Sequence, residues 1–206
     1  VFMNNHLVAT SVIPLGGNNI TKDLSIGLRT STEEAEEVKL NYGHAYYETA
    51  LEDETFEVTV IGSNQKQMYN QVQISDMIEA RLEEIFQLAD KEIRRMGFTD
   101  LRGGYVLTGG TMKMPGVLEL AQEVFHSSAR IAIPDYIGVR EPQFTVGVGT
   151  IQFAYHNAKI QGKDLFPNPI NHQQQVQKPK KQQQPKQKDE GQKESKVANF
   201  FKSFFE

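Results

Sequence analysis

The sequence of 206 residues contains no cysteine. A disulfide framework, a thiolate metal site and a thiol nucleophile are therefore excluded. The five histidines are dispersed without the close spacing of metal ligands, and position alone groups no nucleophile with a histidine and an acid. We therefore predict no metal site and no catalytic residues. No stretch approaches the roughly 18 apolar residues of a membrane-spanning helix, so we expect no transmembrane segment.

Charge is unevenly distributed along the chain. The net charge is −4, but residues 1–162 carry −8 and residues 163–206 carry +4. An acidic body with a basic tail is not typical of a nucleic-acid binder, and the tail lacks the interleaved aromatic residues that single-strand binders use. We therefore expect no nucleic acid among the partners, whereas the tail could meet an anionic surface.

The first 160 residues alternate between strand and helix patterns, which predicts an α/β fold with a partly parallel sheet. Strands are expected at 6–14, within 44–73, at 105–107 (a buried type) and at 129–133, and helices at 19–28, 32–42, 75–96, 116–125 and 143–158. Ser31 and Glu34 fit a capping box at the start of one helix, and Gly97 fits the end of the longest. Residues 62–64 give a turn signal between two strands.

The C-terminal part has a different composition. Residues 161–195 are rich in Gln, Lys, Pro and Asn, so we expect a disordered linker there. In 196–206, five apolar side chains recur at helical spacing, with lysines beside them. This pattern predicts an amphipathic helix that lies in a membrane surface and contacts anionic lipid. Its membrane-binding residues would be Lys196, Val197, Phe200, Phe201, Lys202, Phe204 and Phe205. The alternative is docking on the protein's own core or in a partner's groove.

Two features of the body suggest a ligand site. Thr108–Thr111 is a glycine turn between a strand and a helix, where backbone can approach a ligand closely, although such turns are more often structural. Glu36 and Lys39 share one helix face and could hydrogen-bond a ribose or an adenine edge, but they could equally form a solvated ion pair. The residues alone leave both alternatives open.

Three segments in order carry a resemblance to a known family: PLGGNNITKDLSIGLRTSTEEAEEVKLNYG, LTGGTMKMPGVLELA and PQFTVGVGTIQFA. With the Phe-rich terminus, they resemble the C-terminal portion of the FtsA family, bacterial cell-division homologues of actin in the actin/Hsp70 ATPase superfamily. The resemblance implies an incomplete actin-like (ribonuclease H-like) ATPase fold. Residues 1–30 and 98–160 would form a core subdomain, and 31–97 an inserted subdomain that binds a partner peptide.

The resemblance also implies an adenosine pocket. Its residues would be Gly17, Glu36, Lys39, Gly109, Gly110, Thr111 and Met114. The family's phosphate-binding hairpins and magnesium-side carboxylate have no counterpart in this sequence. ATP with Mg²⁺ is therefore the cofactor implied for the full-length family, whereas we expect weak or absent nucleotide binding here and no enzymatic activity.

The function that the resemblance implies is a link between the FtsZ ring and the membrane. A peripheral membrane protein at the division septum, on the cytoplasmic face, would tether FtsZ, recruit later division proteins and self-associate in its full-length form. We expect the FtsZ C-terminal peptide to contact the exposed side of helix 75–96 and its start, at Asn70, Ser75, Arg81 and Glu84. The alternative function is a nucleotide-dependent actin/Hsp70-like ATPase that acts as a shape-determining or assembly protein.

Overall fold

The computed structural model describes residues 1–63 and 65–163. The predicted helix at 196–206 and nearly all of the predicted linker lie outside the described residues. In the part of the chain that is described, no helix is both long and apolar enough to cross a membrane.

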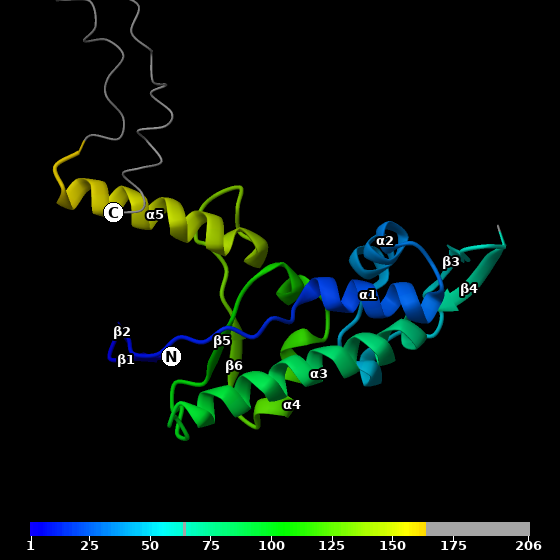
Figure 1. The fold of residues 1–206 in the computed structure, drawn as a ribbon, viewed down its shortest axis with the longest axis horizontal. Helices are drawn as coiled ribbons and strands as arrows, with labels where there is room; N and C mark the ends of the chain where they lie inside the picture. The colour runs from blue at the N-terminus through cyan, green and yellow to red at the C-terminus, as the bar shows by residue number, and fades with distance from the viewer. Residues whose placement is uncertain (64, 164–206) are drawn as a thin grey trace, which may run out of the picture. The chain divides into compact units, whose positions relative to one another are not determined.

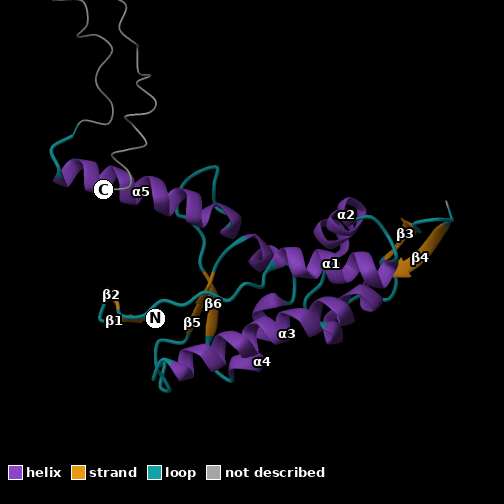
Figure 2. Ribbon diagram, viewed as in Figure 1, coloured by secondary structure: helices purple, strands orange, loops and turns teal. Residues whose placement is uncertain are grey.

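Helices dominate the described residues, and the strands form pairs (Figures 1 and 2). The α-helices are α1 Gly17–Leu28, α2 Thr32–Tyr42, α3 Gln71–Arg95, α4 Val117–Phe125 and α5 Thr145–Ile160. The paired strands are β1 Phe2–Met3 with β2 His6–Leu7, β3 Thr55–Thr59 with β4 Lys66–Asn70, and β5 Tyr105–Leu107 with β6 Ala129–Ile131. The first two pairs are antiparallel and β5–β6 is parallel, which confirms the expected mixture. Short 3₁₀ turns are η1 Tyr47–Thr49, η2 Gly110–Lys113 and η3 Pro142–Phe144.

Helix α2 has the predicted limits, but only half of its predicted capping box forms. The Ser31 hydroxyl accepts a hydrogen bond from the Glu34 N–H at 3.1 Å, as expected of an N-cap. The Glu34 carboxylate does not return to Ser31. It accepts from the Thr59 N–H at 2.8 Å and from the Thr30 hydroxyl at 2.7 Å. The Thr59 hydrogen bond lowers the pKa of Glu34, and the same contact ties α2 to the end of β3.

In the β3–β4 hairpin, buried and exposed residues alternate along β3. Phe56 and Val58 point into the core while their neighbours in β3 are exposed. Tyr42 at the end of α2 stacks on Phe56 with ring centroids 4.3 Å apart. The hairpin is therefore packed on the helices through one face only, as a strand with period-two polarity requires.

Two strand expectations are wrong in part. Within the expected strand 6–14, only His6–Leu7 is a strand, paired with β1. Val12 in the same segment is 88% exposed. A strand exists only where a neighbour pairs with its backbone, and the described residues supply no partner strand beyond Leu7. The expected buried strand 105–107 is confirmed in its limits, but Val106 is 51% exposed because α4 packs toward the other face of the two-stranded sheet.

The longest helix, α3, forms the centre of the core. It begins four residues earlier than predicted because Asn70 caps it, accepting from the Gln73 N–H at 3.0 Å. Its buried residues include Ile78, Leu82 and Phe86, and it packs against α1 and α4. One cluster of buried side chains contains residues from both predicted subdomains. The division at 30/31 and 97/98 stays a prediction.

Candidate functional site

A cavity of about 730 Å³ opens where the start of α1, the middle of α2 and the turn η2 meet. Six of the seven residues predicted for the adenosine pocket line it: Gly17, Glu36, Lys39, Gly110, Thr111 and Met114. Three segments far apart in the sequence thus contribute to one space. The walls also carry amide side chains that the sequence reasoning missed, namely Asn18, Asn41, Gln71 and Gln143.

Gly109, the seventh predicted residue, is not part of the cavity wall. Its φ of +113° lies in the region that favours glycine, and its N–H donates to the Pro142 carbonyl at 3.1 Å. Gly109 therefore turns the chain out of β5 so that Gly110 and Thr111 reach the cavity. Gly109 therefore affects the shape of the cavity although it does not line the cavity.

Gly17 lies close to Thr111 of η2. A Cβ at this position would lie 2.8 Å from the Thr111 hydroxyl oxygen, closer than side chains approach. The absence of a side chain therefore allows the first turn of α1 to lie directly against η2. A side chain at position 17 would therefore require the Thr111 side chain to shift.

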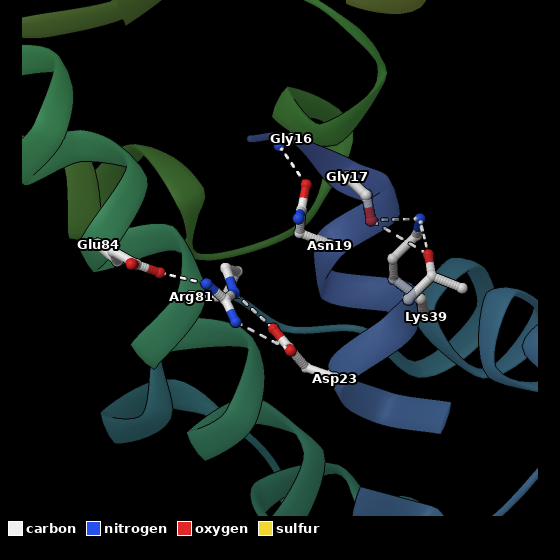
Figure 3. A network of polar contacts seen from close by, with 8 residues as sticks. Gly16, Gly17, Asn19, Asp23, Lys39, Arg81 and Glu84 are labelled. Atoms are coloured by element: carbon white, nitrogen blue, oxygen red, sulfur yellow. Dashed lines mark hydrogen bonds and ion pairs between the residues drawn. The ribbon is translucent and has the colours of Figure 1, made fainter. Parts of the chain in front are cut away.

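Lys39 is the polar centre of the wall formed by α2. Its side chain is only 9% exposed, and its Nζ donates to Glu36 Oε2 at 2.6 Å, to Thr21 Oγ1 at 2.8 Å and to the Gly17 carbonyl at 3.3 Å. Figure 3 shows Lys39 reaching across to the first turns of α1. Thr21, which the sequence reasoning missed, also donates its hydroxyl proton to Glu36 Oε2. Thr21 could have been found from its position one helical turn after Gly17, which places both residues on the same face of α1.

The charges at the cavity are balanced. Partial burial tends to raise the pKa of Glu36, but the hydrogen bonds from Lys39 and Thr21 outweigh it and the pKa is lowered. The other lysine in the wall, Lys113, pairs with Glu141 at 3.0 Å. Each described cation of the cavity wall is therefore already matched by a carboxylate. Such a site favours a largely neutral, hydrogen-bonding ligand over a polyanion.

The residues predicted to bind a partner peptide do not all share an exposed face. Arg81 is bound by Asp23 of α1, with Nε–Oδ2 at 2.5 Å and Nη2–Oδ1 at 2.9 Å, and also by Glu84 (Figure 3). These three residues, with Met77 and Ala80, line a pocket of about 380 Å³. The hydrogen bonding of Arg81 to the Asp23 carboxylate is the main cause of a raised Arg81 pKa. The Arg81 side chain is thus held in place by Asp23 and Glu84.

The expectation that Ser75 is exposed is wrong. Ser75 is fully buried, and its hydroxyl has no hydrogen-bond partner among the described residues. It lies three residues before Ile78 and seven before Leu82, on the apolar stripe of α3. Asn70 is half-buried and serves as the cap of α3. Of the four predicted contacts, only Arg81 and Glu84 come together at one pocket.

Metal ligands are not grouped in the described residues. Over 1–63 and 65–163, no three His, Cys, Asp or Glu side chains are placed to hold an ion.

Comparison with known proteins identifies relatives over most of the chain. A family model described as cell division protein FtsA matches residues 1–149. Cell division protein FtsA of Bacillus subtilis is 62% identical over 165 residues, which cover 80% of this chain and 38% of that protein. Cell division protein FtsA of Enterococcus faecalis is 38% identical over 165 residues, covering 77% of this chain and 38% of that protein. The chain thus spans well under half the length of these relatives.

A solved structure agrees on the fold. MreB5 of Spiroplasma citri bound to ADP matches with a TM-score of 0.55 at 17% identity, over 72% of this chain and 47% of that chain. At this identity the likeness establishes the architecture alone. The expected partial actin-like fold is confirmed.

Proposed function

Since this chain belongs to the FtsA family of cell division proteins, we propose that it is an adaptor that links the FtsZ polymer to the cytoplasmic face of the membrane at the septum. Membership in the family is the observation that carries the proposal. In this role the described body holds the partner peptide, and the predicted helix at 196–206 contacts anionic lipid. Recruitment of later division proteins and self-association belong to the same proposal.

The pocket beside Arg81 supports the peptide part of the proposal. Met77 and Ala80 offer apolar surface, while Arg81 and Glu84 offer a cation and an anion next to it. Arg81 is 27% exposed, and its guanidinium is held by Asp23 and by Glu84, so a peptide carboxylate binds it by displacing Glu84. A short segment with apolar and acidic side chains fits this chemistry.

The adaptor is tested by co-sedimentation with vesicles. The 206-residue chain, vesicles containing anionic lipid and a labelled FtsZ C-terminal peptide are mixed and centrifuged. We expect the peptide in the pellet only when chain and vesicles are both present. Peptide that stays in the supernatant while the chain sediments would reject the peptide-binding role, and a chain that stays in the supernatant would reject the membrane role.

The cavity supports a second candidate function, nucleoside binding in the manner of an actin-like ATPase. Six residues implied by the family resemblance line one space. Because Lys39 and Lys113 are each paired with a carboxylate, we propose that the cavity holds the adenosine part and contributes little to phosphate binding. Adenosine and ATP then bind with similar affinity, and ATP is not hydrolysed. ATP turnover above background would instead favour the ATPase.

Substitution of Gly17 by alanine tests this use of the cavity. The new methyl group would meet the Thr111 hydroxyl at 2.8 Å, so Gly17→Ala is expected to weaken adenosine binding by roughly tenfold, equivalent to one lost contact of about 1.4 kcal/mol. Titration calorimetry with adenosine measures the change. Gly149→Ala in α5 is the matched control, since a Cβ there meets nothing within 4 Å. Equal binding by both variants would contradict a ligand at this wall.

A further inference from the structure

The β3–β4 hairpin has two outer edges, one along each strand. In an antiparallel pair, the backbone N–H and C=O groups of every second residue point away from the partner strand. The Val60 N–H donates to the Gln65 carbonyl at 3.0 Å, next to the last paired residues of the hairpin. The direction alternates from Gln65 onward, so the backbone groups of Lys66 and Met68 point outward from β4.

The outer edge of β3 is occupied at its end by other parts of the chain. The Thr59 N–H donates to the Glu34 carboxylate at 2.8 Å, and the Thr59 carbonyl accepts from the Thr30 hydroxyl at 2.9 Å. The Ile61 N–H donates to the Arg29 carbonyl at 2.8 Å. A further strand cannot pair with this end of β3 without breaking these contacts.

The outer edge of β4 has no such cover. The outward N–H and C=O groups of Lys66 and Met68 have no partner among the described residues, and a strand edge with unpaired groups is a template for another strand. A lysine on an edge usually opposes pairing through its charge. Here Glu57 compensates that charge, since its Oε2 lies 2.8 Å from Lys66 Nζ. Met68 adds an apolar side chain that is 56% exposed.

We propose that the β4 edges of two copies of this chain pair antiparallel about a two-fold axis at Gln67, which joins the two hairpins into one sheet. In this register Lys66 of each copy lies opposite Met68 of the other. Every outward N–H and C=O group of both residues is then paired, and no like charges face each other. A second copy is the occupant because the edge is complementary to itself. The inference names a surface for the self-association included in the proposed function, but it does not depend on lipid or on the FtsZ peptide.

Other two-fold registers fit less well. An axis at Lys66 would place the two lysines opposite each other, and like charges on neighbouring strands oppose pairing. An axis at Met68 would place Asn70 of one copy opposite Lys66 of the other. The Asn70 N–H already donates to Gln73 Oε1 at 3.0 Å within the cap of α3, so it is not available to a second strand. The axis at Gln67 uses only groups that are unpaired in the single chain.

The proposed contact is small and closed. Stable interfaces bury about 1,200–2,000 Å², more than one short strand edge contributes, so we expect the pair to be weak in dilute solution. Both copies use the same surface, so the contact joins two chains and does not continue into a filament. Chains that another contact already holds together reach the roughly millimolar effective concentrations at which a weak pair forms.

The first arm of the experiment uses the absence of cysteine from the sequence. Gln67→Cys and Met68→Cys each give the 206-residue chain a single thiol at an exposed position of β4, and both variants are oxidised at equal protein concentration. Opposite residues at the two-fold axis form a non-hydrogen-bonded pair with Cα atoms about 4.5 Å apart, within the range of a disulfide. The two copies of position 68 are offset along the strands and lie too far apart. On a non-reducing gel we expect the covalent dimer to form at least about tenfold faster in Gln67→Cys.

The second arm reverses a charge in the Gln67→Cys chain. Met68→Lys places a lysine opposite Lys66 of the other copy, and Met68→Glu places a carboxylate there. Opposite charges favour strand pairing and like charges oppose it, so we expect the disulfide to form about tenfold faster with Met68→Glu than with Met68→Lys. Within a single hairpin, Met68 lies opposite Glu57. An effect on hairpin stability alone would therefore give the reverse order.

Each outcome decides the proposal. Equal rates in Gln67→Cys and Met68→Cys would indicate random collision, or an edge that serves an extended peptide instead, and would overturn the pairing. A faster reaction in Met68→Cys would overturn the axis at Gln67, and equal or reversed rates for the two charge variants would overturn the contact between Lys66 and Met68. Neither arm contains lipid or peptide. A chain that fails co-sedimentation with vesicles can therefore still support the pairing, and a chain that passes can still refute it.

Discussion

Replacing Phe200, Phe201, Phe204 and Phe205 together by serine is expected to remove the chain from anionic vesicles. These four rings, with Val197, recur at i, i+3, i+4, i+7 and i+8, the spacing of one helix face. Complete burial of a phenylalanine side chain contributes about 1.5–3 kcal/mol. Even if interfacial burial yields half of the lower figure for each ring, the total is about 3 kcal/mol. The expected loss in vesicle partitioning is therefore at least about 100-fold.

The matched control changes as many side chains to serine without touching the apolar face. This control variant has serine in place of Gln182, Gln183, Gln184 and Gln187, which changes the basic segment only. We expect the variant to sediment with vesicles as the parent does. Leucine at the four phenylalanine positions should retain most of the binding, because the apolar face is kept. If the serine variant of the rings sediments as strongly as the glutamine control, the membrane role of 196–206 is wrong.

Charge and apolar burial can be separated in the same assay. Lys196→Ala with Lys202→Ala removes the two cations within the segment but none of its rings. Each lysine near an anionic surface adds about 1 kcal/mol, so this variant should lose affinity on anionic vesicles and not on zwitterionic ones. The serine variant of the rings should lose affinity on both. The two losses therefore assign separate roles to the rings and the lysines.

Features of the fold that depend on residues close together in the sequence could be predicted. The limits of α2 follow from Ser31 as cap and from Gly43 just after its last residue. The alternation of Phe56 and Val58 sets which face of the hairpin packs. The expected strand 6–14 failed for a non-local reason. Val8 to Val12 have the composition of a strand, but pairing depends on a neighbour that composition does not specify.

The candidate site, too, could be predicted from the sequence only in part. The residues alone suggested Glu36, Lys39 and the turn containing Thr111 as possible ligand contacts. Their grouping with Gly17 in one pocket came from a family resemblance, because nothing in their spacing brings α1, α2 and η2 together. The burial of Lys39 depends on the Gly17 carbonyl and Thr21, which lie in another helix. Ser75 is the opposite case, since its phase on α3 with Ile78 and Leu82 indicated burial and its polarity pointed the other way. At Ser75 the helical periodicity indicated the observed burial, whereas the polar residue type did not.

Phe125 connects the parts of the core that position the glycine turn. It is 6% exposed at the end of α4. Its ring stacks on Tyr105 of β5 with centroids 3.9 Å apart and packs at a tilt on Phe86 of α3 at 5.3 Å. One side chain thus joins α4, β5 and α3. Since β5 leads directly into Gly109 and Thr111, this contact also supports the η2 wall of the cavity.

Phe125→Ala is therefore expected to lower the free energy of unfolding by about 3–5 kcal/mol, the usual cost of removing a buried aromatic ring. Small domains are stable by only about 5–15 kcal/mol, so the urea midpoint followed by helical circular dichroism should fall sharply. Phe153→Ala in α5 is the matched control. Phe153 is 69% exposed, and its loss should cost about 0.5 kcal/mol or less.

Phe125→Leu distinguishes the ring contacts from simple filling of space. Leucine restores most of the apolar volume but cannot stack on Tyr105, and an aromatic pair is worth about 0.5–1.5 kcal/mol beyond its burial. We expect Phe125→Leu to fall between the parent and Phe125→Ala. If Phe125→Ala costs no more than Phe153→Ala, α4 does not hold β5 against α3. The glycine turn would then need a different support, because the parallel pair β5–β6 has only two strands of its own and an isolated two-stranded sheet is marginally stable in water.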